Sequence, residues 1–279
     1  MKKTTIENIK QKKIDGRKIS VLTAYDYTTA KIIDSCDIDI ILIGDSVANT
    51  MLGYDSTIPV TIDEILYHTK MVSKAVVNSM ILADMPFMSY QASEEEGVRN
   101  AGRLVKEGRA NAVKLEGGKE LSSLIKRLSE IGIPVSGHIG LTPQYINNLG
   151  GYKVQGKTKD KINILIEDAL ALQEAGAFMI VFECIPEEVS QIITSKLDVP
   201  SIGIGAGKYC DGQVLVINDI LGLSGEFRPK FVKQYVDLSV QIKNAVSSYK
   251  REIEESLFPD SEHSFHISKE ILINSGLIK

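Results

Sequence analysis

Four acidic residues stand at the ends of short apolar runs. Asp45 follows IILIG, Asp84 follows MILA, Glu116 ends NAVKLE and Glu183 ends AFMIVFE. A single acid in such a place is usually a helix cap or a turn residue. Four acids brought together would repel one another, so we expect a cation or a proton to hold them. Because carboxylate oxygens are hard ligands, the set favours Mg²⁺ over zinc.

Lys114 and Glu116 lie two residues apart in one predicted strand. Strand side chains alternate, so these two share one face, while Val113 and Leu115 share the other. If the apolar pair packs against helices, both charges point inward, where an isolated charge is costly unless it is paired or metal-bound. This pattern favours a functional role for both residues. A structural Lys–Glu ion pair is the alternative.

Two further polar groups are expected beside these acids. His138 ends the run IPVSGH and could bind a carboxylate or carbonyl group of a substrate; a buried structural histidine is the alternative. Ser46 could supply a hydroxyl group beside a metal. The loop at 140–157 is long, polar and rich in glycine, so it either closes over a substrate or is an ordinary surface loop.

These residues need a scaffold of alternating strands and helices. Apolar, β-branched runs separated by stretches with helical spacing predict a parallel sheet. The predicted strands are 19–25, 38–44, 79–84, 111–116, 133–138, 177–183, 200–205 and 213–218. The predicted helices lie near 27–35, 61–77, 93–107, 121–131, 162–175, 186–196 and 229–250.

Eight strands and about seven helices fit a single (β/α)8 TIM barrel, in which the carboxyl ends of the strands meet at one mouth. We expect one domain over 1–279, with the barrel at about 19–250 and a C-terminal extension at 251–279. A doubly wound sheet is the competing architecture. The last two strands lie too close together for the usual helical crossover of about ten to twelve residues. Either that helix is vestigial or the eighth strand lies elsewhere.

The composition excludes several other classes of protein. With 43% hydrophobic and 24% charged residues, the chain is a globular protein with a large core. The net charge is −4 and no basic cluster alternates with aromatic residues, which argues against nucleic-acid binding. Three scattered cysteines argue against disulfides and a zinc cage. No apolar run approaches the roughly 18 residues of a membrane span. We therefore expect a cytoplasmic protein with a small ligand.

Eight blocks of sequence between about residues 19 and 249 contain the residues singled out above and the segments around them. They are LTAYDYTTAK, LIGDSVANTMLGYDSTIPVTIDEILYHT, ADMPFMSY, NAVKLEGG, GIPVSGHIGLTPQ, GGYKVQGK, AFMIVFECIP and SIGIGAGKYCDGQVLV. Together they resemble the ketopantoate hydroxymethyltransferase (3-methyl-2-oxobutanoate hydroxymethyltransferase) family. The resemblance implies a barrel similar to the phosphoenolpyruvate/isocitrate-lyase barrels and a homodecamer. It also implies transfer of a one-carbon unit from 5,10-methylenetetrahydrofolate to 3-methyl-2-oxobutanoate, giving 2-dehydropantoate for pantothenate and coenzyme A biosynthesis.

The resemblance also assigns roles to residues already singled out by charge and position. It implies a Mg²⁺ site at Asp45, Asp84 and Glu116. It implies contacts to the oxo acid from Asp45, Ser46, Asp84 and Lys114, and we expect His138 to orient that substrate. Glu183 resembles the family's proton acceptor. A Mg²⁺-dependent 2-oxo acid lyase or aldolase and a non-catalytic metabolite-binding protein are the alternative functions.

Overall fold

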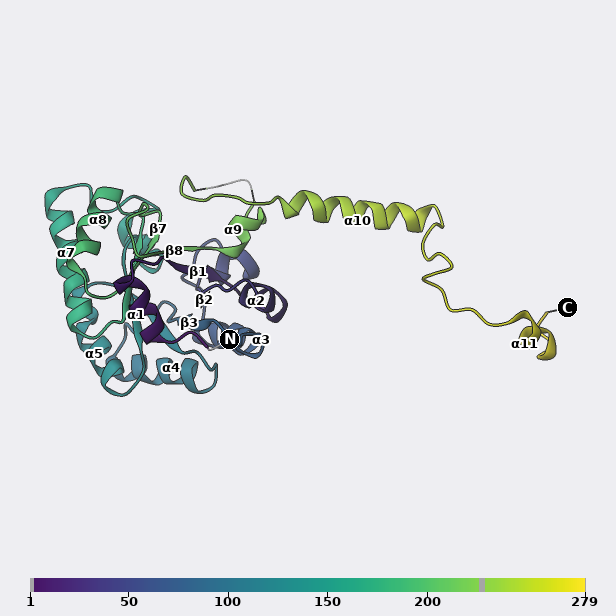
Figure 1. Cartoon of the computed structure of the whole chain (residues 1–279), viewed down its shortest axis with the longest axis horizontal. Coiled ribbons are helices and arrows are strands. Elements are labelled where there is room, and N and C mark those ends of the chain that lie inside the picture. The colour runs from purple at the N-terminus through teal and green to yellow at the C-terminus, as the bar shows by residue number, and fades with distance from the viewer. Residues whose placement is uncertain (1–2, 226–228, 279) are drawn as a thin grey trace. The chain divides into compact units, whose positions relative to one another are not determined.

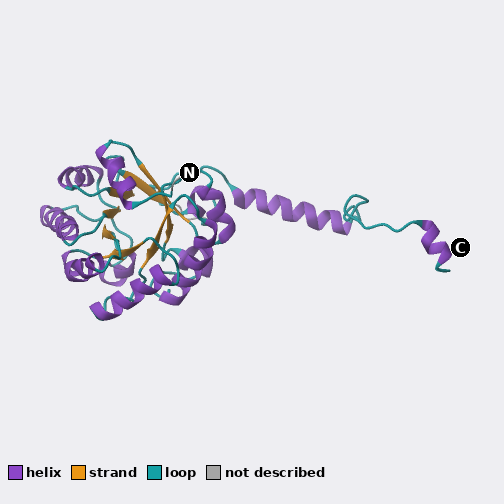
Figure 2. Ribbon diagram, turned by 60° about the horizontal axis from the view of Figure 1, so that its bottom comes forward, coloured by secondary structure: helices purple, strands orange, loops and turns teal. Residues whose placement is uncertain are grey.

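Eight parallel strands pair in sequence order, and the last returns to the first (Figures 1 and 2). The computed structural model describes residues 3–225 and 229–278, so positions 1, 2, 226–228 and 279 of the expected domain lie outside the described residues. The closed barrel confirms the predicted architecture and rules out the doubly wound sheet. Its strands are β1 Ile19–Thr23, β2 Ile40–Ile43, β3 Met80–Asp84, β4 Ala112–Glu116, β5 Val135–Gly140, β6 Met179–Glu183, β7 Ser201–Ile204 and β8 Gly212–Leu215.

Apolar side chains from alternate strand positions fill the barrel interior. Leu42, Leu82, Ala112 and Val181 belong to one buried cluster to which every strand of the barrel except β5 contributes. Because strand side chains repeat every two residues, the face that carries Ala112 also carries positions 114 and 116. The predicted inward direction of Lys114 and Glu116 is therefore confirmed.

Helices surround this ring of strands (Figure 2). Six of the predicted helices are present with ends shifted by a few residues: α2 Tyr27–Asp34, α3 Ile62–Ala75, α4 Glu94–Lys106, α5 Ser122–Glu130, α7 Lys159–Glu174 and α8 Glu187–Lys196. Short helical segments occupy the loops: η1 Ala48–Leu52, η2 Lys119–Leu121, η3 Pro143–Tyr145, α6 Ile146–Leu149 and α9 Ile217–Leu221. Thr61 and Glu64 form a reciprocal capping box at the start of α3.

The helix before the first strand was not predicted. Helix α1 (Ile6–Ile14) has a sequence rich in lysine, and Ile9 is its one buried residue. Ile9 joins the cluster that fills the barrel interior, with Ile6 packed against it. Helix α1 therefore contributes to the core through two side chains, which is too few to give a clear periodic pattern.

The connection between β7 and β8 contains no helix, and the eighth strand, Gly212–Leu215, overlaps its predicted range of 213–218. The crossover helix is therefore vestigial, as the first of the two alternatives stated. A Cβ atom on Gly212 would lie 2.4 Å from the carbonyl oxygen of Ile19. Glycine therefore permits the close contact that joins β8 to β1.

The C-terminal helix differs from its predicted range of 229–250. Helix α10 is Leu238–Glu254, and the Asp237 side chain accepts the backbone N–H of Val240 at its start. Contacts divide the chain into residues 1–220 with 224–233, which contain the barrel, and residues 221–223 with 234–279, which contain α10 and α11 (Lys269–Asn274). Residues of the expected barrel range up to about 250 therefore fall in the second unit. Among the described residues, no helix is long and apolar enough to cross a membrane.

Candidate active site

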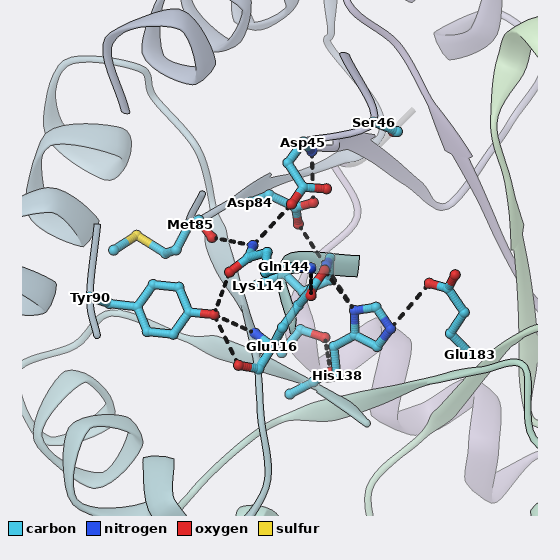
Figure 3. Close-up of polar contacts among 12 residues, drawn as sticks. Asp45, Ser46, Asp84, Met85, Tyr90, Lys114, Glu116, His138, Gln144 and Glu183 are labelled. Carbon is cyan, nitrogen blue, oxygen red and sulfur yellow. Dashed lines mark hydrogen bonds and ion pairs between the residues drawn. The ribbon is translucent and has the colours of Figure 1, made fainter. Parts of the chain in front are cut away.

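Three buried carboxylates meet at the carboxyl-end mouth of the barrel (Figure 3). Asp84 is the last residue of β3, Glu116 is the last residue of β4, and Asp45 follows β2. They are 2%, 1% and 5% exposed, respectively. The backbone N–H of Asp45 donates to Asp84 Oδ2 over 2.9 Å. We call Asp45, Asp84 and Glu116 the carboxylate cluster.

Lys114 lies between two of these acids. Its Nζ is 3.2 Å from Asp84 Oδ1 and 3.6 Å from Glu116 Oε1. Asp84 and Lys114 are register partners on neighbouring strands, which brings the two side chains together. Burial acts to lower the pKa of Lys114, but the surrounding carboxylates outweigh it and raise that pKa above its ordinary value. Lys114 is therefore a charged ammonium group in the site.

The single lysine does not neutralise the carboxylate cluster. Burial, and then repulsion by Glu116 and Asp84, raise the pKa of Asp45 well above its usual range. Burial also raises the pKa of Asp84. Burial opposes ionisation of Glu116 as well, but Lys114 and His138 lower its pKa overall. The cluster therefore has room for more positive charge beside Asp45 and Asp84.

His138 connects the carboxylate cluster to the fourth acid. Its Nδ1 lies 3.0 Å from Lys114 Nζ and 3.4 Å from Glu116 Oε1, while Nε2 lies 3.3 Å from Glu183 Oε2. Burial and Lys114 act to lower the pKa of His138, but Glu116 and Glu183 raise it to about 9. A neutral ring accepts from Lys114 at Nδ1, whereas a protonated ring donates to Glu116. The ring can therefore adjust its hydrogen bonds to the charge of the site.

Glu183 is more open than the other three acids. Its side chain is 16% exposed, against 1% for Glu116. Gly140 is its register partner on β5 and has a φ angle of 96°. A Cβ atom on Gly140 would lie 2.3 Å from the Glu183 carbonyl oxygen. The end of β5 thus needs glycine in order to lie against Glu183.

Ser46 lies at the edge of the site beside Asp45 (Figure 3). Its Oγ is 2.7 Å from the hydroxyl oxygen of Tyr25. Burial raises the pKa of Tyr25 to about 12, so that group is a neutral hydroxyl. The backbone oxygen of Tyr25 lies 2.6 Å from Nδ1 of His68, a buried histidine on α3.

Sequence reasoning missed Gln144, which comes from the loop after β5. Its side chain is buried, and Nε2 donates to Asp45 Oδ2 and to the Met85 carbonyl oxygen, both over 2.9 Å. Its Oε1 lies 2.8 Å from the hydroxyl oxygen of Tyr90, and its backbone N–H donates to Glu116 Oε2 over 3.0 Å. Gln144 therefore joins the loop to two members of the carboxylate cluster.

This chain is similar to known proteins over nearly its whole length. The family model described as ketopantoate hydroxymethyltransferase matches residues 3–261. Curated proteins named 3-methyl-2-oxobutanoate hydroxymethyltransferase from Thermoanaerobacter sp. (strain X514) and Clostridium beijerinckii are each 52% identical over 267 residues, covering 96% of this chain and 97% of their own. This chain belongs to the ketopantoate hydroxymethyltransferase family.

Solved structures show which barrels the ketopantoate hydroxymethyltransferase fold resembles. A phosphonopyruvate hydrolase has a TM-score of 0.61 at 12% identity, covering 99% of this chain and 95% of its own. A 2,3-dimethylmalate lyase of the PEP mutase/isocitrate lyase superfamily has a TM-score of 0.59 at 12% identity, covering 98% and 91%. At this identity the likeness concerns the fold alone, and it confirms the predicted phosphoenolpyruvate/isocitrate-lyase-like barrel.

Proposed function

We propose that this protein transfers a one-carbon unit from 5,10-methylenetetrahydrofolate to 3-methyl-2-oxobutanoate. The product is 2-dehydropantoate for pantothenate and coenzyme A biosynthesis, and water supplies the oxygen of the new hydroxyl group. The names of the relatives over nearly the whole chain support the activity. The observation that carries the proposal is the division of four acids into three buried carboxylates and the more open Glu183.

The carboxylate cluster fits Mg²⁺ in part. Asp84 Oδ1 is buried and has only the Lys114 ammonium group beside it, at 3.2 Å, and Asp45 uses only Oδ2 to accept from Gln144. Over 3–225 and 229–278, however, no three His, Cys, Asp or Glu side chains are placed as a complete ligand set. Mg²⁺ usually takes one or two carboxylates and keeps several waters. Asp45 and Asp84 would therefore hold Mg²⁺, with the Glu116 carboxylate beside them.

When bound, Mg²⁺ would stabilise negative charge on the 2-oxo oxygen of the substrate. The other tasks belong to side chains of this protein. The Lys114 ammonium offsets the charge of the bound oxo acid, Ser46 supplies a hydroxyl group at the edge of the site, and His138 orients the substrate. Glu183 takes the proton from C3, and its Oε2 faces the imidazole of His138, which can stabilise the carboxylate before the transfer. The resulting enolate carbon attacks the methylene carbon of the folate, and one of the two C–N bonds to that carbon breaks as the C–C bond forms. Water then displaces the other folate nitrogen, which completes the hydroxymethyl group and releases tetrahydrofolate.

Deuterium exchange at C3 of 3-methyl-2-oxobutanoate tests the first step. NMR in D₂O, with and without Mg²⁺, should show metal-dependent exchange in the wild type and its loss in Glu183→Gln. Glu188→Gln, an exposed position on α8, is the matched control and should exchange like the wild type. Adding methylenetetrahydrofolate should then give 2-dehydropantoate.

Other outcomes would support the alternative functions. Exchange without a folate-dependent product would point to a lyase or an aldolase. Binding of the oxo acid without exchange would point to a metabolite-binding protein.

We also propose that the chain forms a homodecamer. Helix α10 has no buried residue, and Ile242, Val246, Tyr249 and Ile253 recur on one face with exposed fractions of 47–60%. Such an apolar face fits an interface between copies of this chain. Light scattering should give ten times the chain mass of 30.6 kDa. Val246→Lys should lower that mass, whereas Lys243→Glu, an exposed position on the same helix, should not.

A further inference from the structure

A cavity of about 300 Å³ lies at the carboxyl ends of β4 and β5. Its wall includes Gly117, which directly follows Glu116, and Gly140, which pairs in register with Glu183. The loop after β5 and helix α7 complete the wall. The cavity therefore begins next to the backbone of the proposed base, and its volume lies at the lower end of the range for small-molecule sites.

Two carboxylates that the mechanism does not use, Asp168 and Glu120, line the cavity. Asp168 on α7 accepts the backbone N–H of Lys119 through Oδ1, over 3.0 Å. A Cβ atom on Gly118 would lie 2.2 Å from Oδ1 and 2.6 Å from Oδ2, so the glycine lets this carboxylate lie flat against the loop. Asp168 is partly buried, and burial raises its pKa although the backbone N–H of Lys119 acts to lower it. A ligand with N–H donors would complete its hydrogen bonds.

The remaining wall suits a flat, partly apolar ring. Ile139 and Leu165 are buried apolar side chains, and Tyr145 offers an aromatic ring at the same cavity. Lys161, in the first turn of α7, also lines it. The cavity thus offers an acceptor at one place, apolar contact across the middle and an ammonium group able to pair with an anionic tail.

We propose that this cavity binds the pteridine ring of the reduced folate donor, and that Asp168 recognises the pyrimidine edge of that ring. The amino group and the neighbouring ring N–H on this edge point the same way and match the two oxygens of a carboxylate. The benzoylglutamate tail, which carries carboxylates, pairs with Lys161. The inference rests on the proposed function, which supplies the chemical class of the donor.

Asp168→Asn tests the assignment with little change of shape. Equilibrium dialysis with 5-formyltetrahydrofolate, a stable reduced folate, measures binding without any reaction. We expect the dissociation constant, and the KM for methylenetetrahydrofolate, to rise about 10- to 100-fold, which is the effect of losing one charge-assisted hydrogen bond. Glu167→Gln is the matched control, because Glu167 is the adjacent acid on α7, pairs with Lys119 on the surface and does not line the cavity. It should bind like the wild type.

A second variant covers the case in which Asp168→Asn fails to fold. Ile164 lines the cavity from α7 but is 53% exposed, so Ile164→Trp narrows the cavity without a change in the core. It should also weaken 5-formyltetrahydrofolate binding at least tenfold. Unchanged binding in Asp168→Asn and Ile164→Trp would overturn the proposal.

Deuterium exchange at C3 involves no folate and separates this inference from the proposed function. A wild type that exchanges the hydrogen but binds no 5-formyltetrahydrofolate would refute the cavity assignment alone. A wild type without exchange would refute the proposed function, and the dialysis comparison would still decide whether the cavity binds a folate.

Discussion

Gln144 should hold the carboxylate cluster in place, and Gln144→Met is the sharpest test of that role. Methionine has a similar length and no hydrogen-bonding amide. The substitution removes the 2.9 Å bonds to Asp45 Oδ2 and to the Met85 carbonyl oxygen, and also the 2.8 Å contact with the Tyr90 hydroxyl group. The backbone bond from position 144 to Glu116 remains.

The expected cost follows from the two buried acceptors that lose a donor. Each unsatisfied acceptor costs about 1–3 kcal/mol, and neighbouring losses are not additive. We therefore expect the free energy of unfolding to fall by about 2–4 kcal/mol in urea denaturation. Since partners of metal-binding carboxylates typically contribute about 10- to 100-fold to metal affinity or activity, kcat/KM should fall within that range.

Asn147→Met provides the control, because Asn147 is exposed in the same loop. Its free energy of unfolding should stay within about 0.5 kcal/mol of the wild type. A double-mutant cycle with Asp45→Ala isolates the contact between the two side chains, and the cost of Gln144→Met should be smaller in that background. If Gln144→Met unfolds like the wild type, or costs the same with and without Asp45, the assignment of Gln144 as the support of Asp45 is wrong.

Three further predictions concern the backbone beside the base, an acid remote from the site and the metal. Gly140→Ala should slow C3 hydrogen exchange more than tenfold in the NMR assay, because its Cβ would lie 2.3 Å from the Glu183 carbonyl oxygen and push that residue away; an unchanged rate would contradict this. Burial acts to raise the pKa of Asp34, but hydrogen bonds from the backbone N–H groups at 77–79 lower it overall. The contribution of ionised Asp34 to the stability of the fold is therefore complete above about pH 4 and is lost as the pH falls through the lowered pKa. Asp34→Ala should cost about 2–3 kcal/mol of unfolding free energy at pH 7 and less at pH 3 in urea denaturation, and an equal cost at both pH values would disprove the role. Mg²⁺ at about 100 times its Kd should raise the melting temperature of the wild type by about 5 °C in calorimetry and leave Asp84→Asn unmoved, whereas equal shifts would place the ion elsewhere.

Much of the fold follows from periodicity that can be seen in the sequence. Strand side chains repeat every two residues, so the inward direction of Lys114 and Glu116 depends only on which neighbours are apolar. Parallel strands that close into a barrel bring their carboxyl ends to one mouth, so the meeting of Asp45 with Asp84 follows from the topology. The alternation of strand side chains and the barrel topology therefore predicted that these acids lie together.

Contacts made by loops could not be predicted in this way. Gln144 reaches Asp45 across 99 positions of sequence, and no spacing rule connects a loop glutamine with a carboxylate on another strand. Helix α10 begins at Leu238 rather than at 229, because Asp237 supplies the cap and the apolar pattern alone does not mark the boundary. The acids could be predicted from the sequence, whereas the side chains that support them could be identified only in the structure.

Ile9, the buried residue of α1, belongs to the same apolar cluster as the interior of the barrel. Helix α1 therefore packs at the end of the barrel opposite the carboxylate cluster, and the apolar cluster that it joins lies between the two. A ligand of the carboxylate cluster would accordingly approach from the carboxyl ends of the strands.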